Sequence, residues 1–127
     1  MQARIVISVH RVHRMLHVRL AGFFTIADVA QYETAFRRAV IDLGAGPNQH
    51  LTLCDATEAA LSTAEVTAAF QRVIAKPENR SRRCALVVEG ALARIQARRT
   101  ADREDVMVFD NVPAAQKWLL STVRDAA

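Results

Sequence analysis

The sequence predicts one α/β domain that spans residues 1–127 and contains a mixed sheet, and three observations support this. The length is ordinary for a single domain, which holds about 100–150 residues. Two stretches near the N-terminus alternate apolar and polar residues, as the strands of a hairpin do. Helical patterns and short apolar runs then alternate to the end of the chain. The predicted order is therefore ββαβαβαβα, with the first strand antiparallel and the rest of the sheet mostly parallel.

The hairpin occupies the first twenty residues. With Val12 and His13 at its tip, one register places every strongly apolar side chain on the same face. A slip of one residue would send that set to the other face, so the pattern itself selects the pairing. The predicted pairs are Ile5 with Leu20, Ile7 with Val18, and Val9 with Leu16.

The first helix begins after Gly22, which ends the second strand. Thr25, with Asp28 three positions later, has the form of an N-cap followed by an acidic first turn. The run Gly-Ala-Gly-Pro at 44–47 ends the helix. Its apolar stripe consists of Val29, Tyr32, Phe36, Ala39, Val40 and Leu43.

The second helix lies between two predicted strands, 50–54 and 84–88. Ser62 and Glu65 form a capping box at its start, and the helix stops before Pro77. The strand at 84–88 is a continuous apolar run, which predicts burial on both faces. The apolar stripe of the helix consists of Val66, Phe70, Val73 and Ile74.

Two further helices flank the last strand. Gly90 opens a helix rich in alanine and arginine that continues to Thr100. Residues 106–109 are the predicted strand, and residues 112–124 are the closing helix. The apolar stripe of the closing helix consists of Val112, Ala115, Leu119 and Val123.

Composition excludes several classes of protein. The chain is 51% hydrophobic and 24% charged, which is typical of a globular protein and too apolar for general disorder. No apolar run approaches the roughly 20 residues that cross a bilayer, and the N-terminus lacks the apolar region and cleavage site of a signal peptide. We therefore expect a cytoplasmic protein without an integral membrane segment.

The net charge of +4 is unevenly distributed. Residues 1–20 carry +4 and residues 80–103 carry +5, so the remainder of the chain carries −5. Two separate basic segments are weak evidence for binding in a groove of DNA or RNA, and we predict no nucleic acid partner. A local anionic partner, such as a phosphate or an acidic protein surface, is compatible with this distribution.

Arginines concentrate on the predicted helix that follows Gly90. Arg94 and Arg98 lie one turn apart on one face, and Arg99 begins a neighbouring row. Because arginine binds carboxylates and phosphates bidentately, we predict a partner or anion patch at these three residues. The alternative is an ordinary solvated helix face.

The two cysteines, Cys54 and Cys84, lack the spacing of a metal site. Cys54 ends one predicted parallel strand and Cys84 begins the next, so their thiols are expected about 10 Å or more apart, beyond disulfide reach. The sequence therefore predicts two ordinary buried thiols.

Several segments together resemble a known group of bacterial domains. They are the LAGFFT stretch from Leu20 to Thr25, the strand that ends in Asp55, the run VTAAFQRVIAKPENRSRRCALVVEGALARIQARR and the closing VMVFDNVPAAQKWL. On these segments the chain is similar to the SpoIIAA-like or STAS-type domains, which resemble anti-sigma-factor antagonists and the lipid-exchanging CRAL-TRIO fold. The resemblance implies a single STAS-like domain with a non-enzymatic regulatory or protein-interaction function. It also implies a protein partner, with a homodimer as one option.

The same resemblance draws attention to Ser62. In the anti-sigma-factor antagonists, a serine in an Asp-Ser-x-Gly-type motif after the third strand caps the second helix and is phosphorylated by the partner kinase. Here the aspartate is matched by Asp55, whereas the Ser-x-Gly is not matched. A phosphate on Ser62 would meet the free N–H groups of a helix N-terminus, which makes Ser62 a candidate phosphorylation site. The alternative is that Ser62 is simply an N-cap.

Ligands of open α/β sheets usually bind beyond the carboxyl ends of the parallel strands. That edge is predicted to present Phe23 and Phe24 together with Asp55 and Thr57, and these four are the candidate ligand-binding residues. The alternative function is therefore a carrier or sensor of a small apolar or anionic ligand, such as a lipid, in this crevice.

No constellation predicts catalysis, a metal or a cofactor. Three carboxylates of that edge, Asp55, Glu89 and Asp110, are of the type that binds Mg²⁺, but each also suits a strand-to-helix junction, where an acid meets the helix dipole. No nucleophile motif occurs in the sequence. Three histidines of the hairpin do not converge as helical metal ligands do. They are His10, His13 and His17.

Overall fold

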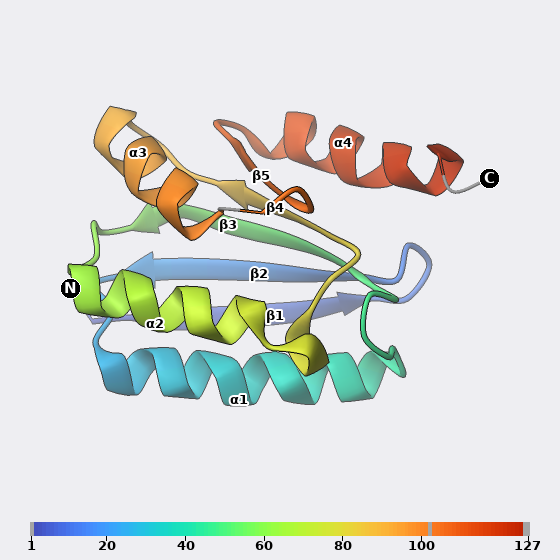
Figure 1. The fold of residues 1–127 in the computed structure, drawn as a ribbon, viewed down its shortest axis with the longest axis horizontal. Coiled ribbons are helices and arrows are strands. Elements are labelled where there is room, and N and C mark those ends of the chain that lie inside the picture. Colours follow the sequence, from blue (N-terminus) through green and yellow to red (C-terminus); the bar gives the residue numbers. More distant parts are fainter. Residues whose placement is uncertain (1, 102, 126–127) are drawn as a thin grey trace.

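The computed structural model describes residues 2–101 and 103–125, with side chains as far as Ser121. In this part of the chain, five strands form one sheet in the order β1-β2-β3-β4-β5 (Figure 1). β1 is antiparallel to β2, and the later neighbours are parallel, so the predicted fold class and element order are confirmed. The elements are β1 (Arg4–His10), β2 (Met15–Gly22), α1 (Ile26–Leu43), β3 (Leu51–Ala59), α2 (Ala64–Ala75), a short 3₁₀ helix (Pro77–Asn79), β4 (Arg83–Val87), α3 (Ala91–Thr100), β5 (Val106–Phe109) and α4 (Val112–Asp125).

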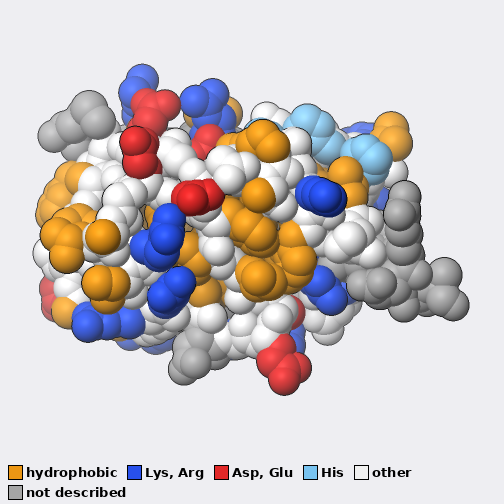
Figure 2. Space-filling model, turned by 90° about the horizontal axis from the view of Figure 1, so that it is seen from above, with side chains coloured by type: hydrophobic (Ala, Val, Ile, Leu, Met, Phe, Trp, Pro, Cys, Tyr) orange, Lys and Arg blue, Asp and Glu red, His pale blue; other side chains and the backbone are white. Residues whose placement is uncertain are grey.

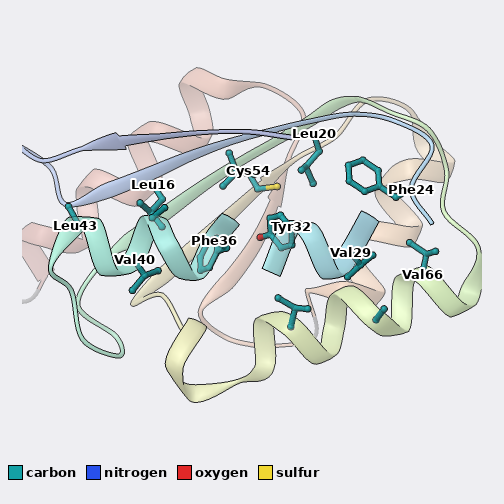
Figure 3. Packing of buried hydrophobic residues seen from close by; sticks show 14 residues of the cluster. Leu16, Leu20, Phe24, Val29, Tyr32, Phe36, Val40, Leu43, Cys54 and Val66 are labelled. Atoms are coloured by element: carbon teal, nitrogen blue, oxygen red, sulfur yellow. The ribbon is translucent and has the colours of Figure 1, made fainter. Parts of the chain in front are cut away.

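The helices cover the two faces of the sheet unequally. α1, α2 and α3 pack on one face, and α4 packs on the other. Figure 3 shows the larger core, in which side chains of α1 and α2 meet those of β2 and β3. In the smaller core, Ala115 and Leu119 of α4 contact the opposite face of β3 and β4. Because α4 packs over β3, β4 and β5 and does not reach β1, the β1 residues on the α4 side of the sheet, such as Val6 and His10, are exposed.

The hairpin and α1 have the predicted geometry. Thr25 is the N-cap of α1, because its hydroxyl accepts from the N–H of Asp28 and the Asp28 carboxylate accepts from the N–H of Thr25. Gly44 ends the helix with a φ of 73°, a left-handed conformation that glycine adopts without strain. All six residues of the predicted apolar stripe are buried. The hairpin pairs Ile5 with Leu20, Ile7 with Val18, and Val9 with Leu16, as predicted.

β3 is longer than the sequence predicts. The expected strand ends at residue 54, whereas β3 continues to Ala59. The additional residues have a partner, because β2 continues beside them after a register shift and pairs Gly22 with Ala59. Asp55 and Thr57 therefore lie within a strand and not in the connection that follows it.

The N-cap of α2 is Thr63, so the prediction that Ser62 caps this helix is wrong by one residue. The Thr63 hydroxyl accepts from the N–H of Val66 at 3.2 Å. The backbone of Ser62 is instead held by Gln96 of α3, whose side chain accepts from the Ser62 N–H at 2.9 Å and donates to its C=O at 2.7 Å. Ser62 thus lies just outside α2, with its backbone bound to α3.

β4 is fully buried on only one of its faces. Ala85 and Val87, which face α4, are fully buried, whereas Leu86 on the other face is only half-buried. The prediction of burial on both faces is therefore wrong, because a cavity separates Leu86 from α2 and α3. The side chain of Val123, predicted for the stripe of α4, lies outside the described residues.

The two cysteines are free thiols, as predicted. Cys54 is buried, as predicted, whereas Cys84 was also expected to be buried and is only half-buried. Cys54 pairs with Leu86 of the neighbouring strand, two residues beyond Cys84, so the two thiols are diagonal neighbours on the same face.

Candidate functional site

An apolar cavity of about 120 Å³ lies between the sheet and the helices α2 and α3. Cys54, Ala56 and Leu86 form its wall on the sheet side. Leu61, in the connection from β3 to α2, also lines the cavity and is 47% exposed. The cavity therefore opens to the surface beside this connection. Other apolar side chains in the lining are Leu20, Phe24, Tyr32, Phe70, Ile74 and Ala97.

Small side chains on α3 create this space. Ala93 and Ala97 line the cavity at positions one helical turn apart, where larger residues would fill it. The Gln96 side chain is already engaged by the backbone of Ser62. Burial raises the pKa of the Cys54 thiol far above its usual range, so this wall stays uncharged. The cavity is therefore suited to an apolar group and not to an ion.

The four predicted ligand-binding residues do not share a crevice. Phe24 is 2% exposed and lines the cavity, whereas Phe23 is 42% exposed and does not. Asp55 and Thr57 face the other side of the sheet, because successive residues of a strand point to opposite faces and Cys54 and Ala56 face the cavity. Together with Arg4, Arg19 and Glu58, they line a separate polar hollow of about 180 Å³.

The predicted arginine patch is only partly available for a partner. Arg94 forms an ion pair of 3.5 Å with Asp110, at the end of β5. Arg98 and Arg99 are exposed and have no ion-pair partner among the described residues. Of the other arginines in this region, Arg80 and Arg103 both bind Asp105, at 3.3 Å and 2.7 Å, and so stabilise the fold.

Two large apolar side chains stand beside these arginines. Leu92 is 67% exposed and Ile95 is 52% exposed, and they lie three residues apart on the outer face of α3. From above α3 and α4, hydrophobic side chains gather in patches with Lys and Arg between them (Figure 2). We use the term α3 surface for the residues Leu61, Leu92, Ile95, Arg98 and Arg99. The sequence contained a signal for this surface, since Ala93 and Ala97 mark the inner face of the helix and leave Leu92 and Ile95 outside.

Two solved structures are similar to this chain over nearly its whole length. One is a Shewanella loihica protein of the DUF3478 family with a SpoIIAA-like fold, at 19% identity and a TM-score of 0.69, covering 92% of this chain and 93% of that one. The chain has a SpoIIAA-like fold. The other is an anti-sigma factor antagonist from Mycobacterium paratuberculosis, at 12% identity and a TM-score of 0.66, covering 93% and 94% of the two chains.

The SpoIIAA-like fold is what these similarities establish, since the sequence identities are low. No family model matches the chain, and no curated protein matches it. None of the helices in the described residues is long and apolar enough to cross a membrane.

Of the three carboxylates predicted for the edge of this SpoIIAA-like fold, Asp55 and Asp110 are engaged by nearby groups, whereas Glu89 is exposed. One oxygen of Asp55 accepts from the N–H and the hydroxyl of Thr57, at 3.1 Å and 2.7 Å. Asp110 accepts from Arg94 and from Asn111. Within the residues described, no three His, Cys, Asp or Glu side chains gather as metal ligands would.

A buried polar cluster at the other end of the sheet was not predicted. His50 Nε2 lies 3.0 Å from the hydroxyl of Ser81, which lies 2.6 Å from the hydroxyl of Thr52. Burial, and then the charge of Arg14, lower the pKa of His50 to about 4. A serine beside a neutral histidine has the composition of a nucleophile and its base, but the adjacent cavity of about 20 Å³ is too small for a substrate. The cluster therefore holds the strand ends together.

The hairpin histidines approach one another without forming a metal site. The rings of His10 and His17 lie 5.8 Å apart on the open face of the sheet. Burial, and then the nearby His10, lower the pKa of His17. His10 is exposed and His17 is half-buried at the turn end of this sheet face.

Proposed function

We propose that this chain is a non-enzymatic regulatory module that binds a partner protein through the α3 surface. The observation that carries the proposal is the exposure of Leu92 and Ile95 on one face of α3. When a partner covers two neighbouring apolar side chains of this size, apolar surface is removed from water, which favours binding. The similarity in fold to an anti-sigma factor antagonist supports a function through protein partners.

The chemistry of the partner follows from the neighbouring charges. Arg98 and Arg99 flank the apolar residues and are without ion pairs in the described part of the chain. Guanidinium groups at the edge of an apolar contact bind carboxylates bidentately. The partner therefore has an apolar patch bordered by acidic side chains.

Ser62 is the candidate regulatory residue of this surface. It follows Leu61 directly, and Gln96 holds its backbone against α3. A phosphate at this position would add about two negative charges next to the apolar contact. Phosphorylation of Ser62 would then repel the acidic border of the partner and release it.

Site-specific photo-cross-linking in native cells tests the proposed partner. A photoreactive residue at Leu92 is compared with one at Lys117 on α4, which is also exposed. We expect one protein to be cross-linked from position 92 and not from position 117, and the adduct to be lost when Arg98→Glu and Arg99→Glu are combined. Arg4→Glu and Arg38→Glu combined, on β1 and α1, are the matched control of equal charge change and should leave the adduct unchanged. The same adducts from both positions, or an adduct that survives the double substitution, would overturn the proposal.

The second candidate function is binding of a small apolar ligand, and the cavity beside α3 favours it. Its volume of about 120 Å³ is close to that of cavities which hold a benzene-sized molecule, about 150 Å³. A long acyl chain does not fit this volume, so the ligand of this candidate is a short apolar group.

Thermal unfolding with benzene and with hexanol as probes tests the cavity. We expect either probe to raise the midpoint for the natural chain, and not for Ala97→Phe, which fills the cavity from α3. Ala101→Phe just beyond the helix is the matched control. No shift with the natural chain, or equal shifts with both variants, would exclude the cavity as the binding site.

A further inference from the structure

A groove of about 600 Å³ runs between β1 and α1. β1 is the edge strand of the sheet that lies farthest from α3 (Figure 1). Ile5, Ile7 and Val9 line it from the strand, and all three are only half-buried. α1 contributes residues of one helical stripe, in which Ala35 and Ala39 are small enough to leave the space open. The groove is therefore apolar along its whole strand side.

The strand beside this groove has a free edge. β1 is the first strand of the sheet and pairs only with β2 among the described residues. Alternate N–H and C=O groups of an edge strand point away from the sheet and are available to another strand. An apolar groove between an edge strand and a helix is the arrangement in which some domains bind an extended peptide as an added strand.

The charges around the groove decide between partners. Asp42, at one end, is neutralised by Arg11 at 3.3 Å. Arg38 on the groove wall, and Arg4 on the opposite face of β1, have no ion-pair partner in the part of the chain that the structure describes. A second copy of β1 would bring no carboxylate to this edge, since β1 contains Arg4 and no acidic residue. An acidic strand matches this edge and a second copy does not.

We infer that the groove between β1 and α1 binds an extended, acidic segment of a partner protein, which adds to the sheet as a strand beside β1. Alternate apolar side chains of the segment cover Ile5, Ile7 and Val9. One of its carboxylates pairs with Arg38 on the groove side, and another pairs with Arg4 on the opposite face of the sheet. On the other face of the sheet, the segment covers Val6, which is 56% exposed. The α3 surface is not involved, so this inference does not depend on the proposed function.

Binding of synthetic peptides tests the inference on the whole chain. The probe has the length of β1, seven residues, and alternates valine with threonine. It carries two glutamates, one near one end on the valine face for Arg38 and one near the other end on the threonine face for Arg4. We expect a Kd of about 10–100 µM by fluorescence anisotropy and slower amide exchange at residues 4–10. The same peptide with lysine in place of glutamate, or with every second amide N-methylated, should bind at least about tenfold more weakly.

Matched variants of the protein locate the site. Arg38→Glu and Ala35→Glu should each weaken binding by about tenfold, and Arg98→Glu on α3 should leave it unchanged. Unfolding midpoints establish that the variants are folded, and the two control peptides decide the question even if a variant does not fold. The inference is overturned by no binding at about 1 mM peptide, by equal binding of the N-methylated peptide, or by a loss of binding in Arg98→Glu alone. Protection of residues 4–10 that rises with protein concentration in the absence of peptide would also overturn it, in favour of a second copy.

Discussion

His50 is held in its neutral form by its surroundings. The ring is 1% exposed, and its pKa is lowered to about 4 from an ordinary value of 6.5. As the pH falls, the unfolded chain therefore binds this proton before the folded chain does. The contribution of His50 to stability is complete above about pH 6.5 and is lost as the pH approaches about 4.

We expect the free energy of unfolding to fall by up to about 3 kcal/mol between pH 6.5 and pH 4, measured by urea unfolding at a series of pH values. His50→Asn should remove most of this dependence. His17→Asn is the control, because burial lowers the pKa of His17 in the same direction but its ring is only half-buried. An unchanged pH dependence in His50→Asn would contradict the assignment.

The capping of α2 gives a second prediction for single residues. Thr63→Ala removes the hydroxyl that accepts from the N–H of Val66 and should destabilise the chain by about 1 kcal/mol. Ser62→Ala removes a hydroxyl that caps nothing and should change the stability by less than about 0.5 kcal/mol. Chemical unfolding of the two variants compares them directly, and the reverse order would restore Ser62 as the cap.

Local chemistry explains which residues could be predicted. Thr25 and Asp28 complete a capping box within four positions, so the sequence was sufficient to identify it. The backbone of Ser62 is bound by Gln96, 34 residues away, and no local pattern contains that information. The pairing of His50 with Ser81, 31 residues apart, was missed for the same reason.

Elements were predicted well where one periodicity governs them. The alternation in β1 and β2 fixed their register, and the stripe of α1 fixed its buried face. The length of β3 was underestimated because the residues after Cys54 are small or polar and carry no strand pattern of their own. They form a strand because β2 pairs with them. The candidate site was predicted less well, since Phe24 alone of the four expected residues lines the cavity.

The connection between β3 and α2 depends on α3, which yields a prediction at the scale of elements. Gln96→Leu removes both hydrogen bonds to Ser62 and leaves the Ser62 backbone groups unpaired. We expect a loss of about 1–3 kcal/mol and faster amide exchange at residues 60–63. Gln116→Leu on the exposed face of α4 is the matched control and should change neither quantity. Unchanged exchange at Ser62 would mean that the connection is held by other contacts.

On the scale of the whole molecule, the two candidate binding surfaces lie at opposite edges of the sheet. The groove follows β1, and the α3 surface lies toward β4 and β5. Two hydrophobic cores bury the central strands of the sheet and lie between the two surfaces. Each surface is therefore supported by a core, and the two surfaces do not contact each other. A partner on one surface therefore leaves the other accessible.

The last prediction separates stability from binding in this arrangement. Leu119 of α4 is 0% exposed against the sheet, and Leu92 of α3 is 67% exposed. Leu119→Ala should lower the free energy of unfolding by about 2–5 kcal/mol, because it leaves a cavity beneath α4. Leu92→Ala should change it by less than about 0.5 kcal/mol in the same urea titration, because its side chain gains little from folding. A comparable loss for the two variants would mean that Leu92 is packed in solution, and the α3 surface would then not be free to bind a partner.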